Sequence, residues 1–130
     1  MTKEEKLWQW FSRYVRLRDS DEHGYAHCFT CGRLDFWKYL DCGHGLGRQH
    51  KSIKFHEKNN HAQCGKCNLD GGRQDVYKEK VNKLYGENAW NDLLLQTRKR
   101  FTWSDFEFEA MAEHYKKEVY RLLIEKGLTL

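Results

Sequence analysis

Apolar residues recur at helical spacing near the beginning of the chain. The segment KLWQWFSRYVRLRD places them at Leu7, Trp10, Phe11, Tyr14, Val15 and Leu17. This spacing is typical of an amphipathic helix with one buried face. Thr2 and Glu5 have the sequence of a capping box, in which the two residues bond each other's free backbone N–H groups. The pattern therefore predicts a helix that runs to about Arg18.

The last third of the chain also predicts helices. Asn88 can cap a short helix through AWNDLLLQTRKR. Ser104 and Glu107 form a second capping box, which opens the segment DFEFEAMAEHYKKEVYRLLIEK, and Gly127 closes it. One stripe of this long helix carries Phe108, Met111, Tyr115, Val119, Leu122 and Leu123. Such a stripe needs a cover, which the first helix or a second copy of the chain could supply.

The middle of the chain, residues 21–86, predicts short strands and a glycine-rich loop, followed by a helix. That helix is expected to begin between Cys67 and Asp75 and to end at Gly86. The chain has no proline, internal repeat or low-complexity segment that would mark a linker. We therefore predict one α+β domain over residues 1–130, with an N-terminal helix (1–20), a central core (21–86) and C-terminal helices (87–130).

Composition limits the class of protein. At 130 residues, with 39% hydrophobic and 15% aromatic content, the chain can bury one core. It has no apolar run near the roughly 18 residues of a membrane span. Its start, MTKEEKLWQW, lacks the apolar region of a signal peptide. We therefore expect a cytoplasmic, intracellular protein without a membrane partner.

The positive charge of the chain is unevenly distributed. The formal net charge is +4, and between His44 and Lys80 eight lysines and arginines face four aspartates and glutamates. A local excess of this kind attracts the phosphate backbone of nucleic acids. A solvated lysine-rich surface would give the same count, so charge alone leaves both interpretations open.

Four of the five cysteines form two C-x-x-C pairs. Cys28 and Cys31 stand in CFTC, and Cys64 and Cys67 stand in CGKC, with 32 residues between the pairs. Each pair can present two thiolates on one side of a tight turn, and four thiolates complete a tetrahedral structural Zn²⁺ site. A thioredoxin-like redox pair would need a βαβ context, which this sequence does not show. Cys42 stands apart and is expected to be a small buried residue without a chemical role.

Five polar residues with catalytic potential lie near the second cysteine pair, four before it and one directly after it. They are Asp41, His44, Arg48, Asn59 and Asn68. A structural zinc site requires none of them. Hydrolysis of a phosphodiester requires a base that activates water, a divalent metal with oxygen ligands, and a cation that binds phosphate. This part of the chain offers a residue for each of these tasks.

The order of these residues resembles the HNH, or ββα-metal, nucleases. In that family a histidine on one strand, an asparagine in the loop and a His or Asn at a helix start build one site, and here those positions are His44, Asn59 and Asn68. Asn59 precedes Cys64 by five residues, as is usual in zinc-stapled HNH proteins. Asn68 follows Cys67 directly, which is similar to the endonuclease VII type of Holliday junction resolvase. The resemblance implies a zinc-stapled ββα-metal core embedded in mainly α-helical surroundings.

A longer resemblance is to the phage recombination proteins of the NinG (Rap) type. It is carried by FSRYVRLRD before CFTCG, by GHGLGR, by KFHEKNNHAQCGKCN and by YKEKVNKLYG. It reaches into MAEHYKKEVYRLL and so covers nearly the whole chain. This resemblance implies an HNH endonuclease that acts on branched DNA, a Holliday junction or a D-loop, in a bacterial or phage-infected cell.

On this hypothesis each polar residue has a role. His44, neutral near pH 7, would take a proton from water, and Asn59 would orient its imidazole across the hairpin. Arg48 would bind phosphate. The catalytic Mg²⁺, or Mn²⁺ in its place, would be held by Asn68 and by Asp41.

One position departs from the HNH pattern. Many HNH sites have an acidic metal ligand directly before the first histidine, where this chain has Gly43. The nearest carboxylate is Asp41, which could reach a metal if the glycines at 43, 45 and 47 let the strand bulge or turn. Asp41 could equally be a surface or capping residue. A zinc-stapled DNA-binding module without catalysis and a helical interaction protein are therefore the alternatives to a nuclease.

The expected substrate also bears on the oligomeric state. A branched junction has two scissile strands related by approximate two-fold symmetry, and two-fold dimers are the commonest oligomers. A nuclease that cuts both strands would benefit from two active sites with the same symmetry. We therefore hypothesise a homodimer with the apolar stripe of the last helix as its contact surface.

Overall fold

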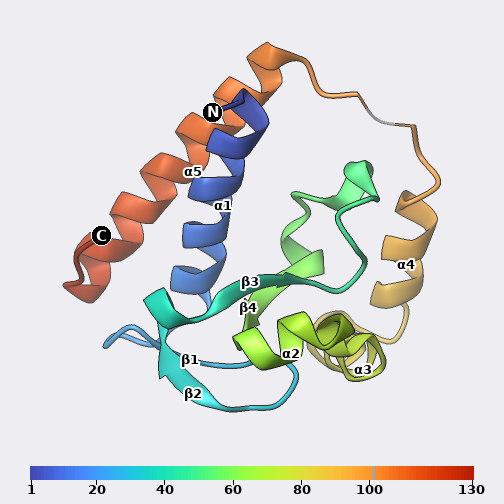
Figure 1. Ribbon diagram of the computed structural model, residues 1–130, viewed down its shortest axis with the longest axis horizontal. Coiled ribbons are helices and arrows are strands. Elements are labelled where there is room, and N and C mark those ends of the chain that lie inside the picture. Colours follow the sequence, from blue (N-terminus) through green and yellow to red (C-terminus); the bar gives the residue numbers. More distant parts are fainter. Residues whose placement is uncertain (101) are drawn as a thin grey trace.

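The computed structural model describes residues 1–100 and 102–130, in which two helical parts lie on either side of a β-hairpin (Figure 1). The helices are Lys3–Arg18 (α1), Gly65–Leu69 (α2), Gln74–Tyr85 (α3), Ala89–Gln96 (α4) and Asp105–Lys126 (α5). The strands are Tyr25–His27 (β1), Leu34–Phe36 (β2), Asp41–His44 (β3) and Asn60–Gln63 (β4). α1 and α5 lie side by side, and the β3–β4 hairpin separates them from α2, α3 and α4. Within the described ranges, no helix has the length and apolar character needed to cross a membrane.

The strands form two antiparallel hairpins. β1 pairs with β2, and β3 pairs with β4 in a register that sets Asp41 opposite Gln63 and His44 opposite Asn60. α2 follows β4 directly, with Cys64 at its N-cap position. The α+β class expected from the sequence is therefore confirmed, and the hairpin and α2 bring the polar residues of the central segment into one region.

The first and last helices begin as their sequences predict. Thr2 and Glu5 form the capping box of α1, and Ser104 and Glu107 form that of α5. Gly127 ends α5 in the left-handed conformation that glycine adopts at least cost. An N-cap of this kind stabilises a helix by about 1 kcal/mol. These boundaries depend on residues close together in the sequence, which is why the sequence predicts them well.

α1 covers the apolar stripe of α5. Fully buried Phe11 meets Tyr115 edge to face, with 4.9 Å between the ring centroids. The stripe residues of α5 that are buried are Tyr115, Val119, Leu122 and Leu123, and those partly buried are Phe108 and Met111. The chain therefore covers this stripe itself. Formation of a homodimer stays a prediction, and this stripe does not supply its contact surface.

The helix that ends at Gly86 begins at Gln74, within the expected range, but a separate short helix precedes it. Gly71 and Gly72 adopt positive φ angles of 64° and 77° between the two helices. An α-helix cannot continue through such angles, so α2 ends at Leu69 and the chain turns before α3 begins. α2 thus carries the second cysteine pair on a helix of its own.

The helix α4 begins after Asn88 as predicted, but it ends before the predicted basic residues. Asn88 occupies the N-cap position, but its side chain makes no cap hydrogen bond. Instead, Oδ1 of Asn82 accepts a hydrogen bond from the Trp90 N–H at 2.9 Å. The helix ends at Gln96, so the basic residues 98–100 lie beyond it.

The glycines of β3 and the following loop allow close packing and do not form a bulge. The pairing of β3 with β4 is continuous from residue 41 to residue 44. A Cβ at Gly43 would collide with the side chain of Gln63, and a Cβ at Gly45 would lie 2.8 Å from Trp90 and 2.9 Å from Tyr77. An acidic residue therefore cannot stand directly before His44 in this packing.

Candidate functional site

The four cysteines of the C-x-x-C pairs converge on one point. The sulfur atoms of Cys28, Cys31, Cys64 and Cys67 all lie within 4.8 Å of one another. Sγ of Cys31 is 3.8 Å from Sγ of Cys64, which is about the edge of a tetrahedron with Zn–S bonds of roughly 2.3 Å. The donor set and its spacing therefore fit one structural Zn²⁺, as the sequence predicts. The cluster ties the β1–β2 hairpin to α2.

The fifth cysteine lies outside this cluster. Cys42 is buried in β3, and its thiol donates to Oδ1 of Asn60 at 3.7 Å. Burial raises the pKa of Cys42 to about 12. The thiol is therefore neutral at pH 7 and is a poor nucleophile and metal ligand.

Asp41 and Asn68 line one pocket together with Arg48. The pocket has a volume of about 340 Å³. Nδ2 of Asn68 donates to Oδ2 of Asp41 at 3.2 Å, although the two residues are 27 positions apart in the sequence. This bond uses the amide nitrogen of Asn68 and one carboxylate oxygen of Asp41, and it does not involve the amide oxygen or Oδ1. The two predicted metal ligands are thus in contact, with Asp41 on the regular strand β3 and Asn68 on α2.

His44, the last residue of β3, is held by two neighbours. Its ring stacks on the indole of Trp8, with centroids 5.0 Å apart and planes inclined by 14°. Nε2 lies 3.2 Å from the carbonyl oxygen of Lys54. A carbonyl oxygen only accepts hydrogen bonds, so Nε2 carries the proton and Nδ1 keeps the lone pair. Burial, together with the positive charge of Arg48, lowers the pKa of His44 to about 4, so the ring is neutral at pH 7.

Basic residues surround Asp41 in the same pocket. The guanidinium carbon of Arg48 lies 4.7 Å from the ring centroid of Trp8, so this indole contacts both Arg48 and His44. Two backbone carbonyl groups fix the guanidinium of Arg16, and Lys38 completes the set of cations. The pocket therefore combines oxygen ligands for a cation with several groups that attract phosphate.

The side chain of Asn59 bonds the backbone of the loop that follows His44. Its amide oxygen accepts from the Leu46 N–H at 2.8 Å, and its amide nitrogen donates to the Leu46 carbonyl at 2.9 Å. The side chain is fully buried. Asn59 therefore fixes the loop that follows His44, while Trp8 and the Lys54 carbonyl orient the imidazole itself.

A chain of hydrogen bonds joins β4 and α3 to the backbone of β3. Nδ1 of His61 lies 3.0 Å from the Tyr77 hydroxyl, and Nε2 lies 2.9 Å from the Tyr85 hydroxyl. The Tyr77 hydroxyl donates to the Gly43 carbonyl at 2.8 Å. Burial lowers the pKa of His61 to about 3, so its ring is neutral. This chain fixes the backbone directly before His44.

One face of α1 lines the pocket, which was not predicted from the sequence. Trp8, Ser12 and Arg16 line it from one face of that helix, since residues four positions apart share a face. Their spacing is visible in the sequence, beside the apolar stripe. No local pattern shows that this face contacts β3, because that contact joins residues far apart in the chain.

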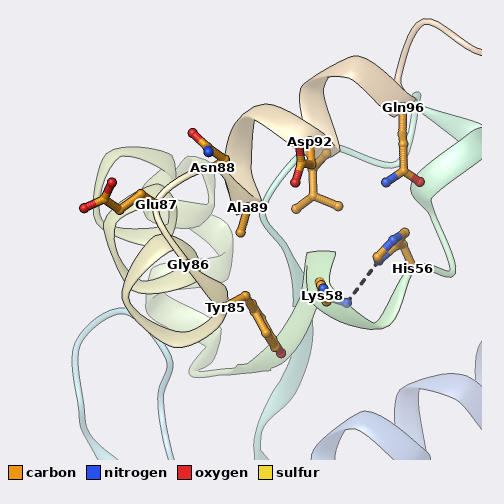
Figure 2. Close-up of a pocket in the computed structure, with 10 residues that line it drawn as sticks. His56, Lys58, Tyr85, Gly86, Glu87, Asn88, Ala89, Asp92 and Gln96 are labelled. Atoms are coloured by element: carbon orange, nitrogen blue, oxygen red, sulfur yellow. Dashed lines mark hydrogen bonds between the residues drawn. The ribbon is translucent and has the colours of Figure 1, made fainter.

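A second pocket, of about 350 Å³, lies where α3 and α4 meet (Figure 2). Its lining combines the acidic residues Glu87 and Asp92 with Lys58 and the amides of Asn88 and Gln96. None of the predicted site residues lines it. The carboxylates would repel a phosphate group, so the pocket at Asp41 is the better candidate for phosphate chemistry.

The comparisons with known proteins identify a family. A family model described as Bacteriophage Lambda NinG protein matches residues 2–125. The matched range contains the four clustered cysteines and every residue of the pocket at Asp41. No curated protein and no solved structure matches the chain.

Proposed function

The chain belongs to the bacteriophage lambda NinG family, and we propose that it is a metal-dependent endonuclease that hydrolyses DNA phosphodiester bonds. One observation carries this proposal: Asp41 and Asn68 meet at 3.2 Å in the pocket that Arg48 also lines. Oxygen ligands for a divalent cation, a cation for phosphate and a neutral histidine are the groups that this hydrolysis requires. They support the HNH assignment made from the sequence.

His44 is suited to act as the general base through Nδ1. The Lys54 carbonyl holds the proton on Nε2, and the Trp8 indole holds the plane of the ring. Nδ1 takes a proton from the water whose oxygen attacks phosphorus. The bond from phosphorus to the 3′ oxygen breaks, and the departing 3′ oxygen takes a proton from solvent, which gives a 5′-phosphate and a 3′-hydroxyl. The negative charge of the bound phosphate raises the pKa of His44 towards neutrality and so strengthens the base.

The pair of Asp41 and Asn68 fits Mg²⁺, with Mn²⁺ as a substitute. Mg²⁺ prefers oxygen ligands and usually keeps several waters, so one or two protein ligands suffice. When bound, the cation supplies charge neutralisation at the phosphate and the leaving oxygen. Asn68 directly follows the zinc ligand Cys67 in α2. Zinc would therefore fix the position of one ligand of the catalytic metal.

We propose branched DNA, a Holliday junction or a D-loop, as the substrate, because the sequence resembles phage recombination proteins. The test uses zinc-loaded protein and duplex, D-loop and four-way junction substrates of one sequence, with and without Mg²⁺. We expect Mg²⁺-dependent cleavage of the branched substrates, with 5′-phosphate ends. Equal cleavage of linear duplex would indicate a general HNH nicking nuclease. DNA binding without any cleavage in Mg²⁺ or Mn²⁺ would favour a catalytically inactive DNA-binding module.

Asp41→Asn should weaken binding of the catalytic metal. The substitution keeps the size of the side chain but removes the negative charge that attracts Mg²⁺. We expect the Mn²⁺ affinity of zinc-loaded protein, measured by calorimetry, to fall by at least about tenfold. Cleavage should then need correspondingly more metal. Asp70→Asn, an exposed position beside α2, is the matched control and should change neither quantity; unchanged Mn²⁺ affinity in Asp41→Asn would remove this residue from the metal site.

Trp8→Ala should change the pH dependence of cleavage. The indole covers the imidazole of His44, and burial is the largest cause of its low pKa. Without the indole, the pKa rises from about 4 towards the ordinary value of 6.5, although Arg48 and Lys54 still oppose protonation. His44 acts only when neutral, so kcat/KM of the variant should start to fall at a higher pH than that of the wild type.

The control for this variant is Trp10→Ala on the same helix. The ring of Trp10 contacts Tyr120 at 5.9 Å, away from the pocket. Its kcat/KM profile between pH 5 and 8 should keep the wild-type shape. A profile of Trp8→Ala that differs from the wild type only by a constant factor would show that the indole does not control the protonation of His44.

A further inference from the structure

Two segments on the same side of the molecule as α4 contain basic residues and no acidic ones. They are residues 42–56 and 93–103, and their cations are Arg48, Lys51, Lys54, Arg98, Lys99 and Arg100. The chain as a whole has 19 acidic residues in 130, so 26 positions of average composition would hold about four. Both segments therefore carry a local positive charge.

The two segments meet at the carbonyl oxygen of Gln96, at the end of α4. The hydroxyl of Ser52 donates to this oxygen at 2.7 Å, and the backbone N–H of Lys99 donates to it at 3.2 Å. Because both donors bond one atom, the backbone next to Lys51 and the backbone of Lys99 are neighbours. Figure 1 shows the loop after β3 beside the last turn of α4.

Five of the six cations are available to a ligand. Arg48, Lys51, Arg98, Lys99 and Arg100 are exposed, and none of them forms an ion pair with another described residue. Lys54 differs, since its amine bonds Glu4 at 2.6 Å. We name the five exposed residues the basic surface. Its like charges repel one another, and a bound polyanion would relieve that repulsion.

Arg48 and Lys51 of the basic surface lie on a loop that buried hydrogen bonds hold in place, next to the candidate site. Asn59 holds the loop through the backbone of Leu46 and the carbonyl of Ile53, and Ile53 is fully buried. Arg48 belongs to both regions, because it also lines the pocket of Asp41. A DNA strand with one phosphate in the pocket can therefore continue over the basic surface.

We propose that the basic surface binds the DNA backbone beyond the cleaved phosphate. This inference rests on the nuclease function proposed above and names a part of the substrate that the pocket does not contact. Cations that neutralise backbone phosphates supply affinity without reading the base sequence. The basic surface would therefore govern binding and its salt dependence, while the rate of hydrolysis at saturation depends on the pocket.

The test replaces Arg98, Lys99 and Arg100 together by glutamine and leaves Arg48 in place. Each lost phosphate contact lowers the slope of log K against log salt by about one, so the triple variant should lose about three in slope. Its Kd for a four-way junction at 0.1 M salt should rise by roughly 10 to 10². The single-turnover cleavage rate at saturating protein should stay within about twofold of the wild type.

A matched control removes as many charges elsewhere, through Lys6→Gln, Lys116→Gln and Lys117→Gln on α1 and α5. This control should bind DNA with the wild-type slope. A wild-type slope in the first triple variant would overturn the proposal, as would loss of binding to anionic lipid vesicles with DNA binding unchanged. If the wild type cleaves no DNA but the first triple variant still shows the smaller salt slope, the basic surface binds DNA and the nuclease function is rejected.

Discussion

Replacing His44 by alanine should lower the rate of DNA cleavage by roughly 10² to 10⁴. The imidazole stacks on Trp8, which lines the pocket; it is neutral at pH 7 and keeps a lone pair on a fixed ring nitrogen. Its removal takes away the acceptor of the proton from water. DNA affinity should change little, because Arg48 and the other cations remain. Single-turnover cleavage in Mg²⁺, with binding measured separately in its absence, checks both expectations.

His50→Ala is the control for this substitution. His50 is a half-buried histidine in the loop that follows His44. Its variant should cleave at close to the wild-type rate. Cleavage at a near wild-type rate by folded His44→Ala would show that another group activates the water.

Replacing Cys31 or Cys64 by serine should strongly destabilise the core. The four thiolates bring the β1–β2 hairpin and α2 together, and the free energy of zinc binding is also free energy of folding. A chain of this size has a small apolar core and depends on such a link. We expect a loss of about 3 to 5 kcal/mol, which corresponds to a fall in Tm of about 10 to 20 °C. Calorimetry and the zinc content of each variant measure the two effects.

Cys42→Ser is the control, because it makes the same substitution at the cysteine outside the cluster. Its side chain lies outside the cluster, and Oδ1 of Asn60 can accept from a serine hydroxyl as it does from the thiol. This variant should keep one zinc per chain and most of its stability. If Cys31→Ser and Cys64→Ser also kept one zinc and the wild-type Tm, the cluster would not be a structural zinc site.

Features that depend on neighbouring residues could be predicted from the sequence. The capping boxes at Thr2 and Ser104 fix the starts of α1 and α5, because a cap bonds the backbone three residues away. The zinc cluster was also predictable, since each C-x-x-C pair presents two thiolates from one turn and few other uses explain two such pairs. The resemblance to HNH nucleases left Asp41 open between a metal ligand beside Asn68 and a surface residue, and the structure brings Asp41 and Asn68 into contact.

Features that depend on contacts between distant segments could not be predicted in this way. Trp8 reaches His44 only because α1 packs across β3, and its own sequence neighbourhood shows an ordinary amphipathic helix. The bonds of Asn59 go to the loop backbone, which a spacing rule cannot show. Gly43 is required by the side chain of Gln63 on the paired strand. Each of these facts follows from packing between segments far apart in the chain.

Nicking of supercoiled plasmid DNA by zinc-loaded wild-type protein, with Mg²⁺ first omitted and then added, tests the central claim most directly. Omission leaves the zinc cluster filled, so it removes only the cation expected at Asp41 and Asn68. The account predicts no nicking without Mg²⁺ and nicks with 5′-phosphate ends after its addition. Intact plasmid in Mg²⁺ and in Mn²⁺, with protein that is folded and bound to DNA, would contradict it.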